Sequence, residues 1–148
     1  MYSRMNIDTV AAIFPEDLET FLPRVALVVD DSMLIRHTVC RFLEERGFTA
    51  EIATNGMEAL EVLKHRSPDL IITDLKMPKM DGNELIDKLK SRSETKDIPI
   101  IVLQGKAVKG DAVYDPRADV AIHKDIEIVA QLDAALKMAM EKKRFVTG

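Results

Sequence analysis

Short apolar runs and longer helical patterns alternate along the chain from residue 25 onward. The runs at 25–29 and 70–73 are almost continuously apolar, as strands are when helices cover both faces of a parallel sheet. Shorter apolar runs at 49–53, 98–103 and 120–122 predict three more strands. Strands that alternate with helices predict a doubly wound α/β fold built on a five-stranded parallel sheet.

Helical periodicity fills most of the intervals between these strands. Gly47 is a suitable stop for the helix after the first strand, and Asn55 is a suitable N-cap for the next helix. Helical spacing resumes at 84–89, and the last helix carries an apolar stripe formed by Ile128, Leu132, Leu136 and Ala139. The interval 105–119 is the exception, because it holds two glycines, a proline and only scattered apolar residues. It predicts a loop-like, mobile segment, so that the fourth helix is weak or missing.

The chain is predicted to form one domain between two short ends. Residues 1–23 are an N-terminal extension, in which 15–22 has the pattern of a short helix with Pro15 at its first position. Residues 24–143 make up the domain, and 144–148 form a C-terminal tail.

Composition and charge narrow the class of protein. The chain has 148 residues, of which 47% are hydrophobic and 31% charged, a balance typical of a globular domain with a buried core. The apolar runs are too short to span a bilayer, no secretory signal is visible, and the single cysteine, Cys40, cannot form an internal disulfide. These features predict a cytoplasmic protein without membrane insertion. The net charge of −4 gives no reason to expect direct binding to nucleic acid.

Three acidic residues stand at the predicted carboxyl ends of two strands. Asp30 and Asp31 follow the first strand, and Asp74 ends the third. Ligands bind at this edge of a parallel α/β sheet, so the three carboxylates meet in one crevice if the two strands are neighbours. Two like charges about 4 Å apart repel by roughly 4 kcal/mol at an effective dielectric constant of about 20. The cluster therefore needs either a cation, for which Mg²⁺ is suited, or a protonated member.

Lys124 ends the fifth predicted strand and brings a positive charge to the same edge. An aspartate beside a metal ion and a lysine can take up a phosphoryl group, because the cations neutralise charge on the transferred oxygens while the carboxylate acts as nucleophile. Taken singly, each residue has a plainer explanation. Asp31 or Ser32 could cap the following helix, and a strand-end lysine is commonly solvated. The combination favours the interpretation as a phosphoryl-transfer site.

Three segments resemble the receiver domain of two-component response regulators, of the single-domain, chemotaxis-regulator type. They are VVDDS at 28–32, PDLIITDLKMPKMDG at 68–82 and PIIVL at 99–103, and the similarity covers about residues 24–143. Within the second segment, Pro78 and Gly82 match the turn that shapes the acceptor loop. The resemblance implies a flavodoxin-like sheet of order 2-1-3-4-5 and a phosphoprotein of a two-component phosphorelay.

The resemblance also implies roles for individual residues. Asp74 matches the phosphoacceptor, and Lys124 matches the lysine that pairs with the phosphoryl group. Asp31 matches a direct ligand of Mg²⁺, and Asp30 matches the acid that often holds the ion through water. The full set implied to hold the ion is Asp30, Asp31, Asp74 and the backbone carbonyl of Lys76.

Three positions depart from the pattern of the family. Gln104 stands at the end of the fourth strand, where the family has Ser or Thr, and its amide can still donate a hydrogen bond. Ala121 replaces a switching aromatic residue, and Asp125 replaces the proline that follows the lysine. These departures predict that phosphorylation is intact while the usual relay is not. A change of order in 105–119 is one alternative relay.

The sequence thus predicts a phosphoacceptor, with slow autodephosphorylation at most, rather than an enzyme. A sensor histidine kinase or phosphotransfer protein is implied as the donor, and the signal is expected to leave through a downstream protein partner. The alternative is a pseudo-receiver that binds a partner independently of phosphorylation, which Gln104, Ala121 and Asp125 favour. A phosphohydrolase is disfavoured, because Lys76 stands where its second acid is expected. DNA binding is disfavoured because no basic recognition helix is apparent.

Overall fold

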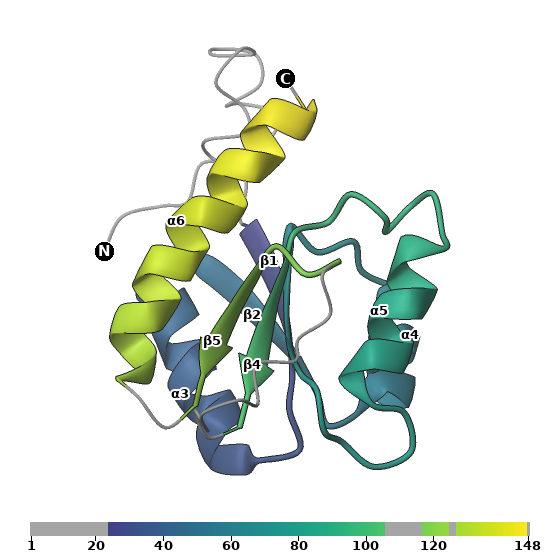
Figure 1. Cartoon of the computed structure of the whole chain (residues 1–148), viewed down its shortest axis with the longest axis horizontal. Coiled ribbons are helices and arrows are strands. Elements are labelled where there is room, and N and C mark those ends of the chain that lie inside the picture. The colour runs from purple at the N-terminus through teal and green to yellow at the C-terminus, as the bar shows by residue number, and fades with distance from the viewer. Residues whose placement is uncertain (1–23, 106–116, 125–126, 148) are drawn as a thin grey trace, which may run out of the picture.

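A five-stranded parallel sheet forms the middle layer of the computed structural model, which describes residues 24–105, 117–124 and 127–147 (Figure 1). The strands lie in the order β2-β1-β3-β4-β5. This order confirms the one implied by the resemblance. The strands are β1 (Arg24–Val29), β2 (Phe48–Ala53), β3 (Leu70–Asp74), β4 (Ile100–Gln104) and β5 (Val120–His123).

The helices of the described residues form the two outer layers. Figure 1 shows α3 and α6 on one side of the strands and α4 and α5 on the other. The two buried apolar clusters divide in the same way, one beneath α3 and α6 and the other beneath α4 and α5. The helices are α3 (Met33–Glu44), α4 (Gly56–Leu63), α5 (Gly82–Lys90) and α6 (Ile128–Thr147).

Alternate residues of a strand face opposite helical layers, which explains why the central strands β1, β3 and β4 are almost continuously apolar. Along β1, Ala26 and Val28 belong to the cluster beneath α3 and α6, whereas Leu27 and Val29 belong to the cluster beneath α4 and α5. All four are fully buried, and burying a Val or Leu side chain contributes about 1.5–3 kcal/mol. The strand that leads to Asp30 is therefore held from both faces.

Capping side chains account for most of the predicted helix boundaries. Ser32 Oγ accepts a hydrogen bond from the Ile35 N–H at 3.3 Å and caps α3, so Ser32 is the capping residue of the two that were considered. Asn55 Oδ1 accepts from the Glu58 N–H at 3.0 Å and caps α4 as predicted. Gly47, expected to cap the end of α3, instead lies two residues beyond the C-cap, Glu45. Its φ of 88° lets the chain turn into β2, because glycine has no Cβ to clash there.

The fourth strand begins two residues later than the apolar pattern predicts. The Ile98 N–H donates to the Thr95 carbonyl oxygen at 3.1 Å and closes a turn, and Pro99 has no N–H to offer a ladder. β4 begins at Ile100, whose N–H donates to the Asp119 carboxylate at 2.6 Å. The partner of this first residue is a polar side chain far along the chain, which an apolar run cannot reveal.

Two further predictions fall outside the described residues. They are the short helix at 15–22 and the loop-like character of the interval 105–119, of which 106–116 is not described. At the other end of the chain, α6 continues to Thr147 and so includes most of the predicted tail.

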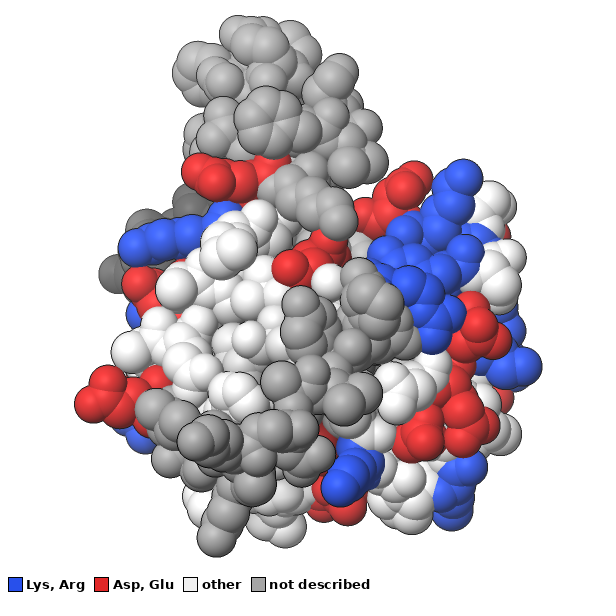
Figure 2. Space-filling view, viewed as in Figure 1, with Lys and Arg blue, Asp and Glu red and all other residues white. Residues whose placement is uncertain are grey.

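Charges of both signs share the molecular face drawn in Figure 2. Lys and Arg gather on it toward the end of α5, whose last turn carries Lys88 and Lys90, and Asp and Glu lie beside them. The mixture agrees with the modest net charge of −4. Among the helices that the structure describes, none combines the length and the apolar character needed to cross a membrane.

Candidate functional site

The carboxyl ends of β1 and β3 bring three aspartates together. The two strands pair in parallel with Val29 opposite Thr73, so the next residues, Asp30 and Asp74, leave the sheet side by side. Carboxylate oxygens of Asp30, Asp31 and Asp74 lie within 4.8 Å of one another. Asp30 is fully buried and Asp74 is 5% exposed, whereas Asp31 is open to solvent. The cluster thus has a buried floor and one solvent-facing member.

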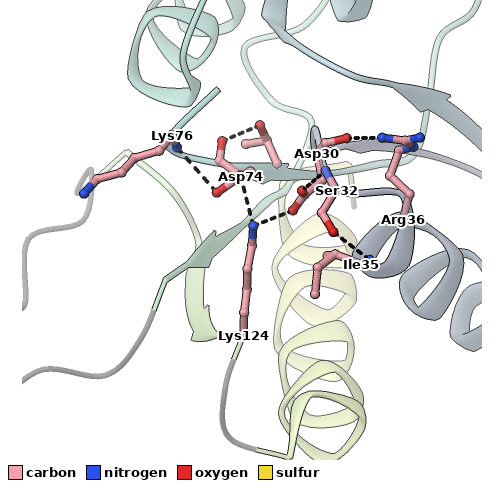
Figure 3. Close-up of polar contacts among 8 residues, drawn as sticks. Asp30, Ser32, Ile35, Arg36, Asp74, Lys76 and Lys124 are labelled. Carbon is pink, nitrogen blue, oxygen red and sulfur yellow. Dashed lines mark hydrogen bonds and ion pairs between the residues drawn. The ribbon is translucent and has the colours of Figure 1, made fainter. Parts of the chain in front are cut away.

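Lys124 follows the outer strand β5, and its side chain extends to two of these aspartates. Its Nζ lies 2.8 Å from Asp30 Oδ2 and 3.0 Å from Asp74 Oδ2 (Figure 3). The lysine side chain is 20% exposed, so salt screens these ion pairs much less than it screens surface pairs. One cation therefore balances two carboxylates, and the cluster keeps an excess of negative charge.

Asp30 is held by two hydrogen bonds that the sequence analysis did not predict. The Ser32 backbone N–H donates to Asp30 Oδ1 at 2.8 Å, and Arg36 Nη1 donates to the Asp30 carbonyl oxygen at 2.7 Å (Figure 3). Arg36 lies one turn into α3, so this helix fixes the end of β1. Apolar periodicity carries no information about a polar side chain that bonds a backbone carbonyl.

The backbone after β3 is packed tightly around Asp74. The Lys76 N–H donates to Asp74 Oδ1 at 3.4 Å, and the Gly82 N–H donates to the Leu75 carbonyl oxygen at 2.8 Å. A Cβ on Gly82 would clash with the Asp74 carbonyl oxygen and lie 2.8 Å from Leu75 Cα. Thr73 Oγ1 donates to the same Asp74 carbonyl oxygen at 2.9 Å. Only glycine at position 82 therefore allows the start of α5 to approach the acceptor strand this closely.

The surroundings of Asp74 disfavour its negative charge. Burial raises the pKa of Asp74, and the Asp30 carboxylate raises it further, while the hydrogen bond from Lys124 opposes the rise. Burial alone would lower the pKa of Lys124, but its hydrogen bonds to Asp30 and Asp74 outweigh burial and raise it. An aspartate in such surroundings gains from any further positive charge placed beside it.

Of the three positions expected to depart from the family, Gln104 lies at this edge of the sheet and Ala121 lies within β5. Gln104 is the last residue of β4 and 9% exposed, and its carbonyl oxygen accepts from the Lys124 N–H at 3.0 Å. Ala121 lies on β5 opposite Val102 and is half-buried. Asp125 lies outside the described residues. The departures that the structure describes are thus confined to β4 and β5.

Another residue that the sequence analysis missed is Gln131, on α6. Its side-chain amide forms two hydrogen bonds with the backbone of His123, the residue before Lys124. In the sequence Gln131 is one of several polar residues between the apolar positions of a helix, and no spacing marks it out.

The three aspartates are chemically suited to a hard divalent cation. They offer only oxygen donors, close to one another, and Mg²⁺ is commonly bound by one or two carboxylates together with retained water. Asp31, which is open to solvent, leaves room for such water on one side. The backbone carbonyl of Lys76 stays a predicted ligand.

The sequences of curated response regulators align with most of this chain. Response regulator Rre1 of Synechocystis sp. is 32% identical over 108 residues, which cover 71% of this chain and 47% of that protein. Response regulator MprA of Mycobacterium ulcerans is 35% identical over 116 residues, which cover 75% and 49%. The chain thus spans about half the length of these curated relatives.

Solved receiver domains share the fold. The chemotaxis response regulator CheY4 of Vibrio cholerae superposes with a TM-score of 0.69 at 27% identity, over 79% of this chain and 99% of that one. The signal receiver domain of a histidine kinase from Syntrophus aciditrophicus gives a TM-score of 0.66 at 31% identity, over 80% and 91%.

A model of the response regulator receiver domain family matches residues 26–137. Members of this family are signalling phosphoacceptors rather than classical enzymes, and they typically bind Mg²⁺ at an acidic site. Because the match covers well over half of the sequence and the sheet has the expected strand order, this chain belongs to the receiver domain family of two-component response regulators.

Proposed function

We propose that this chain accepts a phosphoryl group on Asp74 in the presence of Mg²⁺ and signals through a protein partner. The observation that carries the proposal is the setting of Asp74. The residue is 5% exposed, its carboxylate lies 3.0 Å from Lys124 Nζ, and two further carboxylates lie within 4.8 Å. A carboxylate held beside fixed positive charge is suited to attack a phosphoryl group, because the charge on the transferred oxygens is neutralised where it arises.

In the proposed reaction a carboxylate oxygen of Asp74 attacks the phosphorus atom of the donor. A P–O bond to Asp74 forms, the bond between phosphorus and the leaving group breaks, and the electron pair departs with that group. Lys124 Nζ, which contacts Asp74 Oδ2, is placed to donate to an oxygen of the phosphoryl group. The Lys76 N–H, which faces Asp74 Oδ1, is a second donor at the same carboxylate.

Asp30, Asp31 and Asp74 are the side chains proposed to hold Mg²⁺, with the backbone carbonyl of Lys76 as a further ligand. When bound, the ion supplies positive charge to the acidic cluster and to the transferred phosphoryl oxygens. The excess negative charge left after Lys124 has paired with two carboxylates supports this assignment. Asp31 faces solvent and provides an open side for entry.

A sensor histidine kinase or a phosphotransfer protein is the proposed donor, because response regulators receive phosphoryl groups from histidine kinases. The proposed receiver of the signal is a downstream protein that distinguishes the phosphorylated from the unphosphorylated form.

The proposal is tested by intact-mass measurement after incubation with a small acyl phosphate. The wild-type protein should gain the mass of one phosphoryl group with Mg²⁺ and not after chelation of the ion. The Asp74→Asn variant should gain none, whereas Asp87→Asn, which alters an exposed aspartate on α5, should be labelled like the wild type. An adduct on Asp74→Asn would place the acceptor at another residue and refute the assignment.

A phosphorylation-independent protein-binding module is the second candidate. It is favoured by Gln104 and Ala121, which stand where the family has its hydroxyl and its switching aromatic residue. If the wild-type protein gains no mass under conditions that label another receiver domain in the same experiment, this second function replaces the first.

A further inference from the structure

The backbone of His123, the last residue of β5, forms two hydrogen bonds with a side chain of α6 in place of a neighbouring strand. Gln131 Nε2 donates to the His123 carbonyl oxygen at 2.7 Å, and the His123 N–H donates to Gln131 Oε1 at 3.0 Å. β5 is an outer strand of the sheet, so its outward-facing N–H and carbonyl groups have no neighbouring strand to bond. The amide of Gln131 satisfies both groups of His123 at once.

The backbone is held from the other side at the very next residue. The Lys124 N–H donates to the Gln104 carbonyl oxygen of β4 at 3.0 Å. The segment 123–124 is therefore tied to α6 through Gln131 and to β4 through its own backbone. This is the segment from which the Lys124 side chain extends to Asp30 and Asp74.

We propose that Gln131 is a positioning residue that sets where Lys124 Nζ lies relative to Asp74, an inference that rests on the proposed phosphoryl transfer at Asp74. Lysine has a flexible four-carbon stem, so the place of its charge depends on how firmly its backbone is anchored. A shift of the anchor moves Nζ away from two contacts of 2.8 and 3.0 Å. Gln131 would thereby affect the reaction without touching the reacting atoms.

Two substitutions separate the paired hydrogen bonds from simple packing. Gln131→Met keeps the length of the side chain and its compatibility with a helix but removes both hydrogen bonds. Gln131→Glu keeps the shape and one acceptor but sets an oxygen against the His123 carbonyl, which offers no proton. We expect each variant to slow phosphorylation of Asp74 by about tenfold, because small misplacements of catalytic groups have large effects on rate.

A loss of stability alone is excluded by a control on the same helix. Ala139 is fully buried on α6, two turns away from Gln131 along the chain, and Ala139→Gly lowers helix stability without touching the paired amide. At a temperature well below unfolding, Ala139→Gly should be phosphorylated at the wild-type rate. If it slows phosphorylation as much as Gln131→Met, the effect is one of stability and the proposal fails.

Dependence on Lys124 is tested by combining substitutions. If Gln131 acts through Lys124, Gln131→Met should slow phosphorylation no further in a Lys124→Ala background. Rate losses that multiply in the double variant would show that Gln131 acts by another route, and would overturn the proposal.

A readout that needs no phosphorylation keeps this inference separate from the proposed function. Lysine amines are pulse-acetylated in the absence of Mg²⁺, and the modified residues are quantified by peptide mass spectrometry. Lys124, held in two ion pairs, should react slowly in the wild type and about fivefold faster in Gln131→Met, in proportion to the loss of a typical hydrogen bond. Exposed Lys88 serves as the internal reference. Unchanged acetylation of Lys124 refutes the role of Gln131 even if Asp74 is phosphorylated, whereas faster acetylation supports it even if Asp74 is not.

Discussion

By the resemblance noted in the sequence, the carboxyl ends of β1 and β3 keep the acids expected of a receiver domain, whereas those of β4 and β5 keep only the expected lysine. The first pair carries Asp30, Asp31 and Asp74, the proposed phosphoacceptor and metal ligands. The second pair keeps Lys124 but has Gln104 at the hydroxyl position. Backbone pairing does not explain the difference, because both pairs are parallel and in regular register. Within the described residues, the proposed departures at Gln104 and Ala121 are differences of side chain.

This difference suggests that taking up a phosphoryl group and passing on the signal depend on separate parts of the site. Uptake requires charge in fixed places, and Asp30, Asp74 and Lys124 are held there by backbone hydrogen bonds and ion pairs. In the relay implied by the resemblance, transmission depends on a side chain that moves, and Ala121 has none of the reach of an aromatic ring. We therefore expect substitutions on the acidic side to affect uptake strongly and substitutions at Gln104 to affect it little.

Apart from loss of the acceptor itself, the largest effect is expected from Lys124, which follows β5 and pairs with the acids at the ends of β1 and β3. Lys124→Met should slow phosphorylation of Asp74 by about 100-fold, because a preorganised positive charge beside the transferred oxygens is lost. The rate is measured by intact mass over time. Lys88→Met removes the same charge from an exposed position on α5 and should leave the rate unchanged. A Lys124→Met rate within threefold of the wild type would make its ion pairs purely structural.

The meeting of Asp30 and Asp74 could be predicted from the sequence, because it depends only on the order of the strands that they follow or end. Apolar runs located β1 and β3, and once these strands are neighbours, Asp30 and Asp74 must meet at one edge. The cap at Asn55 was predicted for a similar reason, since it lies within three residues of its partner.

Contacts between polar side chains and distant backbone could not be predicted in this way. Arg36 bonds the Asp30 carbonyl oxygen, and Gln131 bonds both backbone groups of His123. Asp119 sets the start of β4 in the same manner. These contacts depend on how a helix or turn docks on the sheet, which neither periodicity nor local spacing encodes. The polar supports of the site were therefore missed, although its acids were found.

Gly82 tests whether close backbone packing is needed on the acidic side. Gly82→Ala should lower the free energy of unfolding by about 2 kcal/mol, because the new Cβ meets backbone atoms of Asp74 and Leu75, which cannot move aside as a flexible side chain can. Urea unfolding measures the change. Gly105→Ala is the matched control, since its Cβ would meet nothing within 4 Å. Equal stability of the two variants would show that the approach of α5 to β3 is easily relaxed.

The pH dependence of the free energy of unfolding should show how strongly the acidic cluster disfavours the charge on Asp74. The pKa of Asp74 is raised in the folded state, so between the ordinary value of 3.8 and the raised value the folded protein binds the proton more tightly than the unfolded chain. Stability from this group is therefore highest at low pH and is lost as pH rises through that window.

Relative to Asp74→Asn, which does not titrate at this position, the wild type should lose stability across that window and reach a plateau above it. Urea unfolding at a series of pH values without Mg²⁺ measures the difference. Added Mg²⁺ should then stabilise the wild type more than the variant at neutral pH, because the ion binds the folded carboxylates. If the difference in free energy of unfolding between the two proteins does not vary with pH, the pKa of Asp74 is not raised in the folded state.

The smallest effect on uptake is expected at Gln104. Gln104→Thr restores the hydroxyl typical of the family, yet an amide and a hydroxyl can each donate one hydrogen bond to a phosphoryl oxygen. The bond from the Lys124 N–H goes to the Gln104 backbone carbonyl and does not depend on the side chain. The phosphorylation rate should therefore change by less than about threefold, the effect expected when one modest hydrogen bond replaces another. Intact mass over time, beside Lys124→Met in the same experiment, measures it. If Gln104→Thr alters the rate as strongly as Lys124→Met does, Gln104 takes part in the chemistry, and uptake and transmission are not separable in this domain.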